Sequence, residues 1–172
     1  HWSDAHGVAL NGQLFLCGYS QGGHATMALH RRLQRYHADE LSVTASAPMA
    51  GAYDLSGATR QDLVSGRPMP NPYYTAYLLA AYQRVYRFSP HWSEWLASPY
   101  NEDLPPLLNG RVDEDTINSA MPSRLDELFT REALEAFESN PQHPLRVAMR
   151  DNDVDDWSPE APMRLYHCPH DE

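Results

Sequence analysis

The sequence predicts an α/β fold in which a small parallel sheet is interrupted by a helical insertion. Two short runs of apolar and small residues, 13–17 and 41–50, flank a segment with helical periodicity. Strand signals are then absent over 56–156, where helical pieces separated by Pro and Gly follow one another. Another strand-like run occurs at 162–167. We therefore expect core segments at 1–55 and 157–172 and a helical cap or lid at 56–156.

The composition is that of a globular protein and argues against several classes. Of the 172 residues, 42% are hydrophobic and 21% are charged, which fits one domain or one core with a large insertion. The formal net charge is −10, so we expect no nucleic-acid partner. No apolar run approaches the roughly 18 residues that cross a bilayer, and we expect neither a membrane span nor a signal peptide.

The first core segment is predicted to be a strand, a helix and a second strand. Gln13–Cys17 is a short apolar run that is typical of a strand buried on both faces. The helix after it carries apolar residues at helical spacing, namely Ala25, Ala28, Leu29, Leu33 and Tyr36. Leu41–Ala50 is β-branched and small, and predicts the second strand. This order favours a right-handed parallel unit.

The insertion is predicted to consist of short helices. Asn71 followed by Pro72 is a helix start. The apolar face expected for that helix comprises Tyr74, Tyr77, Leu78, Ala81 and Val85. Further helical pieces are predicted after Ser89, after Ser123, after Thr130 as an N-cap, and over 143–150.

The motif that carries chemistry is Gly18-Tyr19-Ser20-Gln21-Gly22, which matches Gly-x-Ser-x-Gly between a predicted strand and a predicted helix. At so sharp a turn Ser20 is expected to adopt strained dihedrals, with small residues at Gly18 and Gly22 letting the backbones pass. The N–H of Gln21, at the helix start, would then stabilise an oxyanion. A glycine-rich turn with a chance serine is the alternative.

These residues resemble the α/β-hydrolase superfamily, and within it the secreted bacterial lipase and esterase-like branch. The resemblance rests on 14–31, 47–55 and 157–172. It implies a partial α/β-hydrolase fold, a secreted or periplasmic location, and hydrolysis of carboxylic esters through acylation of Ser20. In that family a strand is followed by His-Gly, two variable residues and the triad Asp. Here the frame holds with Cys168 in place of Gly, which maps Asp171 onto the acid.

The resemblance also implies a base that these residues do not supply. The family order is Ser, acid, His, and the sequence stops one residue beyond Asp171. Neither His24 on the elbow helix nor His170 beside the acid is expected to serve. We therefore expect an internal fragment of a larger hydrolase, inactive by itself. Two alternatives stay open, a peptidase of the same fold and a non-catalytic truncated or binding fragment.

Aromatic residues concentrate in the insertion, with nine of them between Tyr73 and Tyr100. Tyr77, Trp92 and Trp95 are predicted to contact the acyl part of a small-molecule or lipid ester, and ordinary packing is the alternative. The acidic run 151–156 opens like a calcium loop but lacks the Gly and Glu that such a loop needs. Hence we expect no metal and no cofactor.

Overall fold

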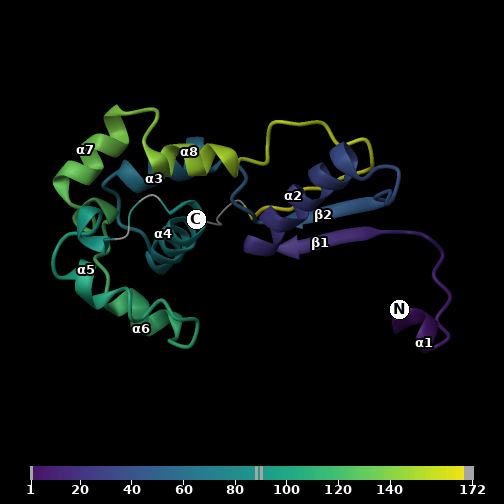
Figure 1. Ribbon diagram of the computed structural model, residues 1–172, viewed down its shortest axis with the longest axis horizontal. Coiled ribbons are helices and arrows are strands. Elements are labelled where there is room, and N and C mark those ends of the chain that lie inside the picture. The colour runs from purple at the N-terminus through teal and green to yellow at the C-terminus, as the bar shows by residue number, and fades with distance from the viewer. Residues whose placement is uncertain (1, 88, 90, 169–172) are drawn as a thin grey trace. The chain divides into compact units, whose positions relative to one another are not determined.

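The computed structural model describes residues 2–87, 89 and 91–168. Its chain forms two compact units (Figure 1): unit 1 comprises His1–Asp54 and Asp153–Glu172, and unit 2 comprises Leu55–Asn152. Residues 153–156, which the sequence prediction placed in the insertion, belong to unit 1. The reason is a contact with the first core segment, since the Arg31 guanidinium donates to the carbonyl of Asp153 at 2.7 Å.

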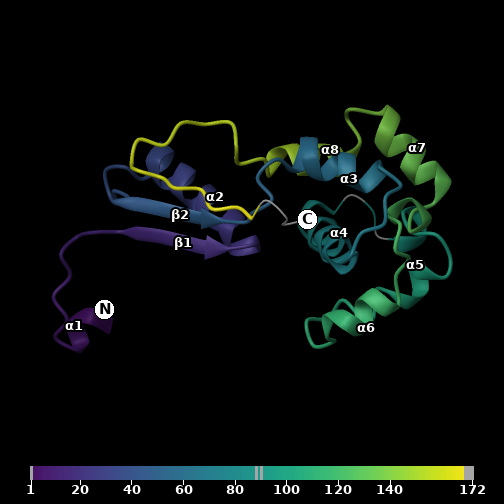
Figure 2. The same cartoon turned by 180° about the vertical axis from the view of Figure 1, so that it is seen from behind.

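Unit 1 is built around a parallel pair of strands. Its elements are α1 (Trp2–Ala5), β1 (Phe15–Tyr19), α2 (Gln21–Tyr36) and β2 (Ala45–Met49). The strands pair in parallel, with Phe15 opposite Ala45 and Tyr19 opposite Met49, and α2 forms the crossover between them. Figure 2 shows α2 against one face of this pair. The α/β class with a parallel sheet is therefore confirmed.

The predicted run at 162–167 lies beside β2. Parallel bridges join Ser46 to Met163 and Met49 to Tyr166. The Ser46 amide donates to the Pro162 carbonyl and the Arg164 amide donates to the Ser46 carbonyl, both at 3.0 Å. The order across the sheet is thus β1, β2 and then this segment, so all three carboxyl ends lie at one edge, where ligands bind in open α/β sheets.

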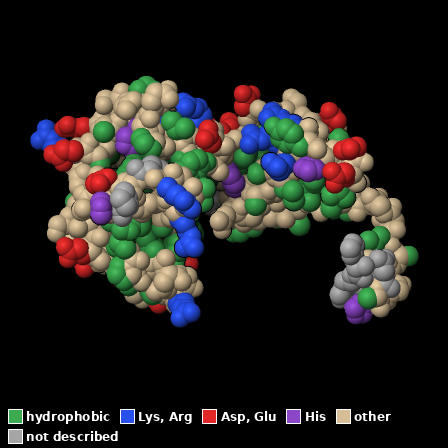
Figure 3. All heavy atoms as spheres, in the orientation of Figure 1, with side chains coloured by type: hydrophobic (Ala, Val, Ile, Leu, Met, Phe, Trp, Pro, Cys, Tyr) green, Lys and Arg blue, Asp and Glu red, His purple; other side chains and the backbone are tan. Residues whose placement is uncertain are grey.

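Only one face of this sheet is covered within the described part of unit 1. Met27 and Leu33 of α2 are buried, as are Ser46 and Pro48 of β2. On β1, however, Phe15 is 63% exposed and Tyr19 is 68% exposed. The prediction that β1 is buried on both faces is wrong for the described residues, because the side chains of Phe15, Cys17 and Tyr19 on one face of the strand are exposed. Figure 3 shows hydrophobic side chains at the surface of unit 1.

Unit 2 is a compact set of short helices with a closed core. Its elements are η1 (Leu55–Thr59), α3 (Arg60–Val64), α4 (Tyr73–Tyr86), η2 (Trp92–Glu94), α5 (Tyr100–Asp103), α6 (Glu114–Ser119), η3 (Leu125–Glu127), α7 (Arg131–Ser139) and α8 (Pro144–Asp151). The predicted cap of α7 is present, since the Thr130 hydroxyl accepts from the Ala133 amide at 3.2 Å. The core is fully buried at Leu104, Ile117, Leu128 and Met149. No described helix of either unit is both long enough and apolar enough to cross a membrane.

The buried face of α4 differs from the predicted one. The buried residues are Thr75, Ala76, Leu79 and Tyr82, whereas Tyr74 and Val85 are exposed. Apolar residues lie on nearly every side of this helix, so spacing alone did not fix which side meets the core. The position of the neighbouring helices decides it.

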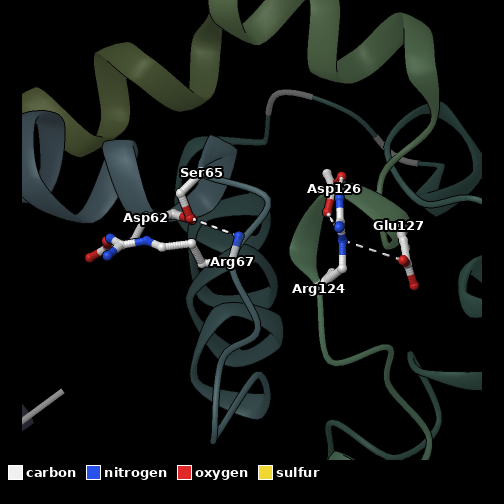
Figure 4. Close-up of polar contacts among 6 residues, drawn as sticks. All are labelled: Asp62, Ser65, Arg67, Arg124, Asp126 and Glu127. Atoms are coloured by element: carbon white, nitrogen blue, oxygen red, sulfur yellow. Dashed lines mark hydrogen bonds and ion pairs between the residues drawn. The ribbon is translucent and has the colours of Figure 1, made fainter.

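Ion pairs lie on the surface of unit 2 (Figure 4). Arg67 pairs with Asp62 at 2.9 Å, and Arg124 pairs with Asp126 at 2.6 Å and with Glu127 at 3.4 Å. The hydrogen bond from Arg124 holds the pKa of Asp126 below its usual value. Solvent screening makes such exposed pairs weak. We therefore expect burial of the apolar core to contribute more to the stability of this unit than these ion pairs do.

Candidate active site

Ser20 occupies a backbone conformation that residues with a side chain rarely adopt. Its φ is 55° and its ψ is −121°, between the end of β1 and the start of α2. Such a conformation costs about 1–3 kcal/mol and persists only where surrounding structure holds it. The Ser20 amide donates to the Met49 carbonyl at 2.9 Å, and its carbonyl accepts from the amides of Gly23 and His24. The strain expected of the elbow is present.

Two glycines let the backbones pass at this turn. A Cβ on Gly18 would lie 2.1 Å from the carbonyl oxygen of Gly22, and one on Gly23 would lie 2.3 Å from the carbonyl oxygen of Met49. A Cβ on Gly22 would meet nothing within 4 Å. The steric role predicted for Gly22 is therefore wrong, because Gly23 is the residue that faces β2. The sequence does carry a signal for this role, because Gly23 directly follows Gly22.

The start of α2 offers a place for a developing negative charge. Gln21 is its first residue, so its amide has no partner inside the helix. The aligned peptide dipoles add partial positive charge at this end. The Ser20 side chain makes no capping hydrogen bond to the helix. A hydroxyl not engaged in capping thus lies next to the Gln21 amide, which has no partner inside the helix, and this arrangement can stabilise an oxyanion formed at Ser20.

Two described histidines of unit 1 form hydrogen bonds to groups other than Ser20. His24 Nδ1 lies 2.7 Å from the carbonyl oxygen of Ala52, which requires the proton on Nδ1. His30 Nδ1 lies 2.9 Å from the hydroxyl of Ser46 on β2. Over 2–87, 89 and 91–168, no histidine ring forms a hydrogen bond to the Ser20 hydroxyl. A base for Ser20 is not found among these residues.

The predicted acid, Asp171, lies outside the described residues. The segment that leads to it is described through Cys168, which is exposed. The Ala50 amide donates to the Tyr166 carbonyl at 2.8 Å, so the segment ends at the edge of the sheet that also carries Ser20. Met49 of β2 contacts both the elbow and this segment. Its carbonyl accepts a hydrogen bond from the Ser20 amide, and it forms a parallel bridge with Tyr166. One strand, β2, separates the elbow from the segment expected to carry the acid.

The three predicted acyl-contact residues lie in unit 2. Trp95 is 9% exposed and its ring meets the ring of His143 edge to face at 4.9 Å. Tyr77 and Trp92 are partly buried and pack against the core. Trp95 also lines a small apolar cavity together with Leu63, Phe129, Ala133, Leu134, Phe137 and Leu145. The surroundings of Trp95 are those of a core residue, and the lid role stays a prediction.

Acidic and other metal-ligating side chains do not gather in the described part of the chain. No group of three or more His, Cys, Asp or Glu residues there could hold a metal ion. The acidic run 151–156 is divided between the two units, since α8 ends at Asp151 and residues from Asp153 onward pack with unit 1.

The fold is similar to that of two solved hydrolases. Over 96% of this chain it matches a ligand-bound form of the rice cell wall degrading esterase LipA from Xanthomonas oryzae, with a TM-score of 0.85 and 26% sequence identity. It also matches a candidate hydrolase from Legionella pneumophila over 96% of the chain, with a TM-score of 0.82 and 25% identity. Neither a protein-family model nor a curated protein matches the sequence.

The match covers only part of each solved structure, 45% of the LipA chain and 44% of the Legionella chain. This chain contains the two parallel strands with the elbow between them, in the order β1, α2 and β2, and the helices of unit 2 follow. The chain therefore has a partial α/β-hydrolase fold of the type found in these enzymes, as the sequence resemblance implied. The neighbours support hydrolase function for this fold.

Proposed function

We propose that this chain is the part of a serine hydrolase of carboxylic esters that carries the nucleophile Ser20, the acid Asp171 and a helical cap. The observation that carries the proposal is the conformation of Ser20, with φ 55° at a strand-to-helix turn. Strain of this kind is retained where it serves a function, because an ordinary turn would relax it. The similarity to an esterase supports ester cleavage.

The reaction proposed for Ser20 is acyl transfer in two steps. The Ser20 oxygen attacks the carbonyl carbon of the ester, and the carbonyl electron pair moves to the oxygen. The Gln21 amide stabilises this oxyanion. Its collapse breaks the ester C–O bond, the base passes the proton taken from Ser20 to the leaving oxygen, and the alcohol departs with the acyl group left on Ser20. Water then attacks the acyl-enzyme by the same route and releases the carboxylic acid.

The proposal assigns the base to a histidine outside the present sequence. Ser20 needs a base within hydrogen-bonding reach, and the acid must orient that base. Among the described residues no histidine ring is hydrogen-bonded to the Ser20 hydroxyl, and the chain spans less than half the length of the solved structures it matches. These two observations support a triad that is completed by a longer protein.

The substrate we propose is a small-molecule or lipid ester. The formal charge of −10 disfavours polyanionic substrates. The aromatic side chains of Tyr77 and Trp92, which lie at the margin of the unit 2 core, offer apolar surface for an acyl chain. LipA, one of the solved enzymes with this fold, is described as an esterase.

The test compares the full-length protein that contains these residues with its Ser20→Ala variant. We expect Ser20→Ala to abolish hydrolysis of a p-nitrophenyl ester and labelling by a fluorophosphonate probe. Ser42→Ala, at an exposed position between α2 and β2, is the matched control and should behave as the wild type. Turnover in Ser20→Ala at the wild-type rate, or cleavage of amides without esters, would contradict the proposal.

The acid is tested by Asp171→Asn in the same protein. The base would lose its counter-charge and its tautomer control, and kcat should fall by a factor on the order of 10⁴. A loss below tenfold would assign the acid to another residue. Residues 1–172 alone should show no Ser20-dependent turnover, and clear turnover would place the base inside this chain.

A further inference from the structure

The side-chain amide of Gln34 pairs with the backbone of the segment that comes after unit 2. Its Nε2 donates to the Ser158 carbonyl at 3.0 Å, and its Oε1 accepts from the Glu160 amide at 2.9 Å. A residue of a neighbouring parallel strand would bond to the same carbonyl and the same amide. A primary amide is suited to this because it presents a donor and an acceptor on one planar group. Gln34 therefore substitutes for a strand partner.

The composition of the segment explains why a side chain is needed there. Pro159 and Pro162 have no amide hydrogen, so the segment cannot build a continuous ladder of hydrogen bonds. Glu160 lies between them, and its amide donates the hydrogen bond to Gln34 Oε1. Gln34 thus bonds to the segment where the two prolines leave it few amide donors.

Two neighbours on α2 act on the same segment. Arg31 donates to the Asp153 carbonyl at 2.7 Å. The ring of His30 meets the ring of Trp157 edge to face at 5.1 Å, and His30 Nδ1 lies 2.9 Å from the hydroxyl of Ser46. The segment is therefore fixed against α2, and through His30 against β2.

The position of this segment sets the register of the residues after Glu160. There the chain pairs with β2, where the Pro162 carbonyl accepts from Ser46 and the Tyr166 amide donates to the Pro48 carbonyl. A slip of one residue would shift the chain by about 3.3 Å and turn every side chain to the other face. Because α2 also begins at the Ser20 elbow, one helix fixes both the nucleophile and this segment.

We propose that Gln34 is a positioning residue that sets the register of 158–167 against β2 and thereby places the triad acid relative to Ser20. This inference rests on the proposed function. A displacement of about 1 Å in such a site can cost about 100-fold in rate, so loss of the Gln34 amide should act mainly on kcat.

The experiment uses the full-length protein and two variants. Gln34→Met keeps the length of the side chain and removes both hydrogen bonds. Gln34→Glu keeps the acceptor for the Glu160 amide and removes the donor to Ser158. Gln61→Met, at an exposed glutamine of α3 in unit 2, is the matched control. Fluorophosphonate taken up at the end point counts the competent Ser20 sites, so kcat is expressed per competent site and partial unfolding is removed from the comparison.

We expect kcat per competent site to fall roughly 10- to 100-fold in Gln34→Met and less in Gln34→Glu, with KM within about twofold of the wild type. Hydrogen exchange at the Glu160 amide should accelerate in Gln34→Met, and Gln61→Met should match the wild type in all three measurements. An unchanged kcat per competent site, with or without faster exchange at Glu160, would overturn the positioning role. If the wild type is not labelled at Ser20, the proposed function itself fails, and the positioning role fails with it.

Discussion

Unit 1 and unit 2 bury their apolar side chains to very different extents. The core of unit 2 is closed, with Leu104, Ile117 and Leu128 fully buried. In unit 1 the exposed fraction is 77% for Leu10 and above 60% for Phe15. The unit that contains the candidate nucleophile is thus the one with the smaller core.

The difference shows where support for the strained elbow comes from. A large core is not what holds Ser20, since the elbow depends on close backbone contacts between β1, α2 and β2. Gly18 and Gly23 permit those contacts, and the Ser20 amide is tied to the Met49 carbonyl. Local backbone packing therefore stabilises the site, while unit 2 is stabilised by apolar burial.

The largest expected effect separates the units. Residues 55–152 expressed alone should unfold in one cooperative thermal transition, because their core is complete within the unit. Residues 1–54 alone should not, since too little apolar surface is buried to offset chain entropy. Circular dichroism melting and binding of a hydrophobic dye measure this. A cooperative transition for 1–54 would break the comparison.

The next effect compares one leucine from each unit. Leu128→Ala in unit 2 should lower the free energy of unfolding by about 2–5 kcal/mol, because it opens a cavity in a packed core. Leu10→Ala in unit 1 should change it by less than about 0.5 kcal/mol, as expected at an exposed site. Urea denaturation of the two variants checks the difference. Equal losses would mean that Leu10 is covered in solution.

Among the described residues each unit buries one histidine, and the two differ in hydrogen bonding. His30 in unit 1 is bonded to Ser46, whereas His143 in unit 2 is 8% exposed and its Nδ1 has no partner among the described residues. His30→Phe should cost about 1–3 kcal/mol, because the buried Ser46 hydroxyl loses its partner. His143→Phe should cost less, since the aromatic contacts with Trp95 and Phe137 are kept.

The same histidines make stability depend on pH. Burial lowers the pKa of His30. Burial is also the main cause that lowers the pKa of His143, and the positive charge of Arg146 is the smaller cause. The unfolded chain therefore takes up protons first, near pH 6.5, so the free energy of unfolding should fall as pH drops below that value. Urea unfolding at pH 8 and at pH 5 measures the slope, which should be reduced in each Phe variant. A slope unchanged in both would contradict this.

A smaller effect is expected at the elbow itself. Ser20→Gly should raise the free energy of unfolding by about 1 kcal/mol, because relief of the strain exceeds the entropy that glycine adds to the unfolded chain. Ser20→Ala keeps the strain and should stay close to the wild type. Both variants should lack esterase activity. Destabilisation by Ser20→Gly would show that the strain is not stored at this residue.

The smallest effect concerns the predicted lid. Tyr77→Ala and Trp92→Ala should reduce turnover of long acyl esters severalfold relative to acetate esters, if these side chains contact the acyl chain. Trp95→Ala should instead lower the melting temperature, because Trp95 lies in the core. Assays on p-nitrophenyl acetate and p-nitrophenyl palmitate separate the two cases. Uniform losses for both esters would favour ordinary packing.

The sequence predicted the elements that depend on neighbours along the chain. The strand, elbow and helix around Ser20 are indicated by a change of periodicity and by closely spaced glycines, and the Thr130 cap is indicated by one residue and the turn after it. These are short-range features, in which a few adjacent residues fix the backbone. The α/β class and the placement of Ser20 could therefore be predicted without a structure.

The tertiary structure alone decided which face of each element is buried and what holds the site together. The predicted face of α4 was wrong because an almost wholly apolar helix carries no preferred side in its own sequence. The glycine that is sterically required is Gly23 and not the predicted Gly22, because β2 approaches the backbone at Gly23. The hydrogen bond from Gln34 to Ser158 joins residues that are 124 positions apart. Such contacts join residues that are far apart in the sequence, and neither periodicity nor local spacing predicts which of these residues meet.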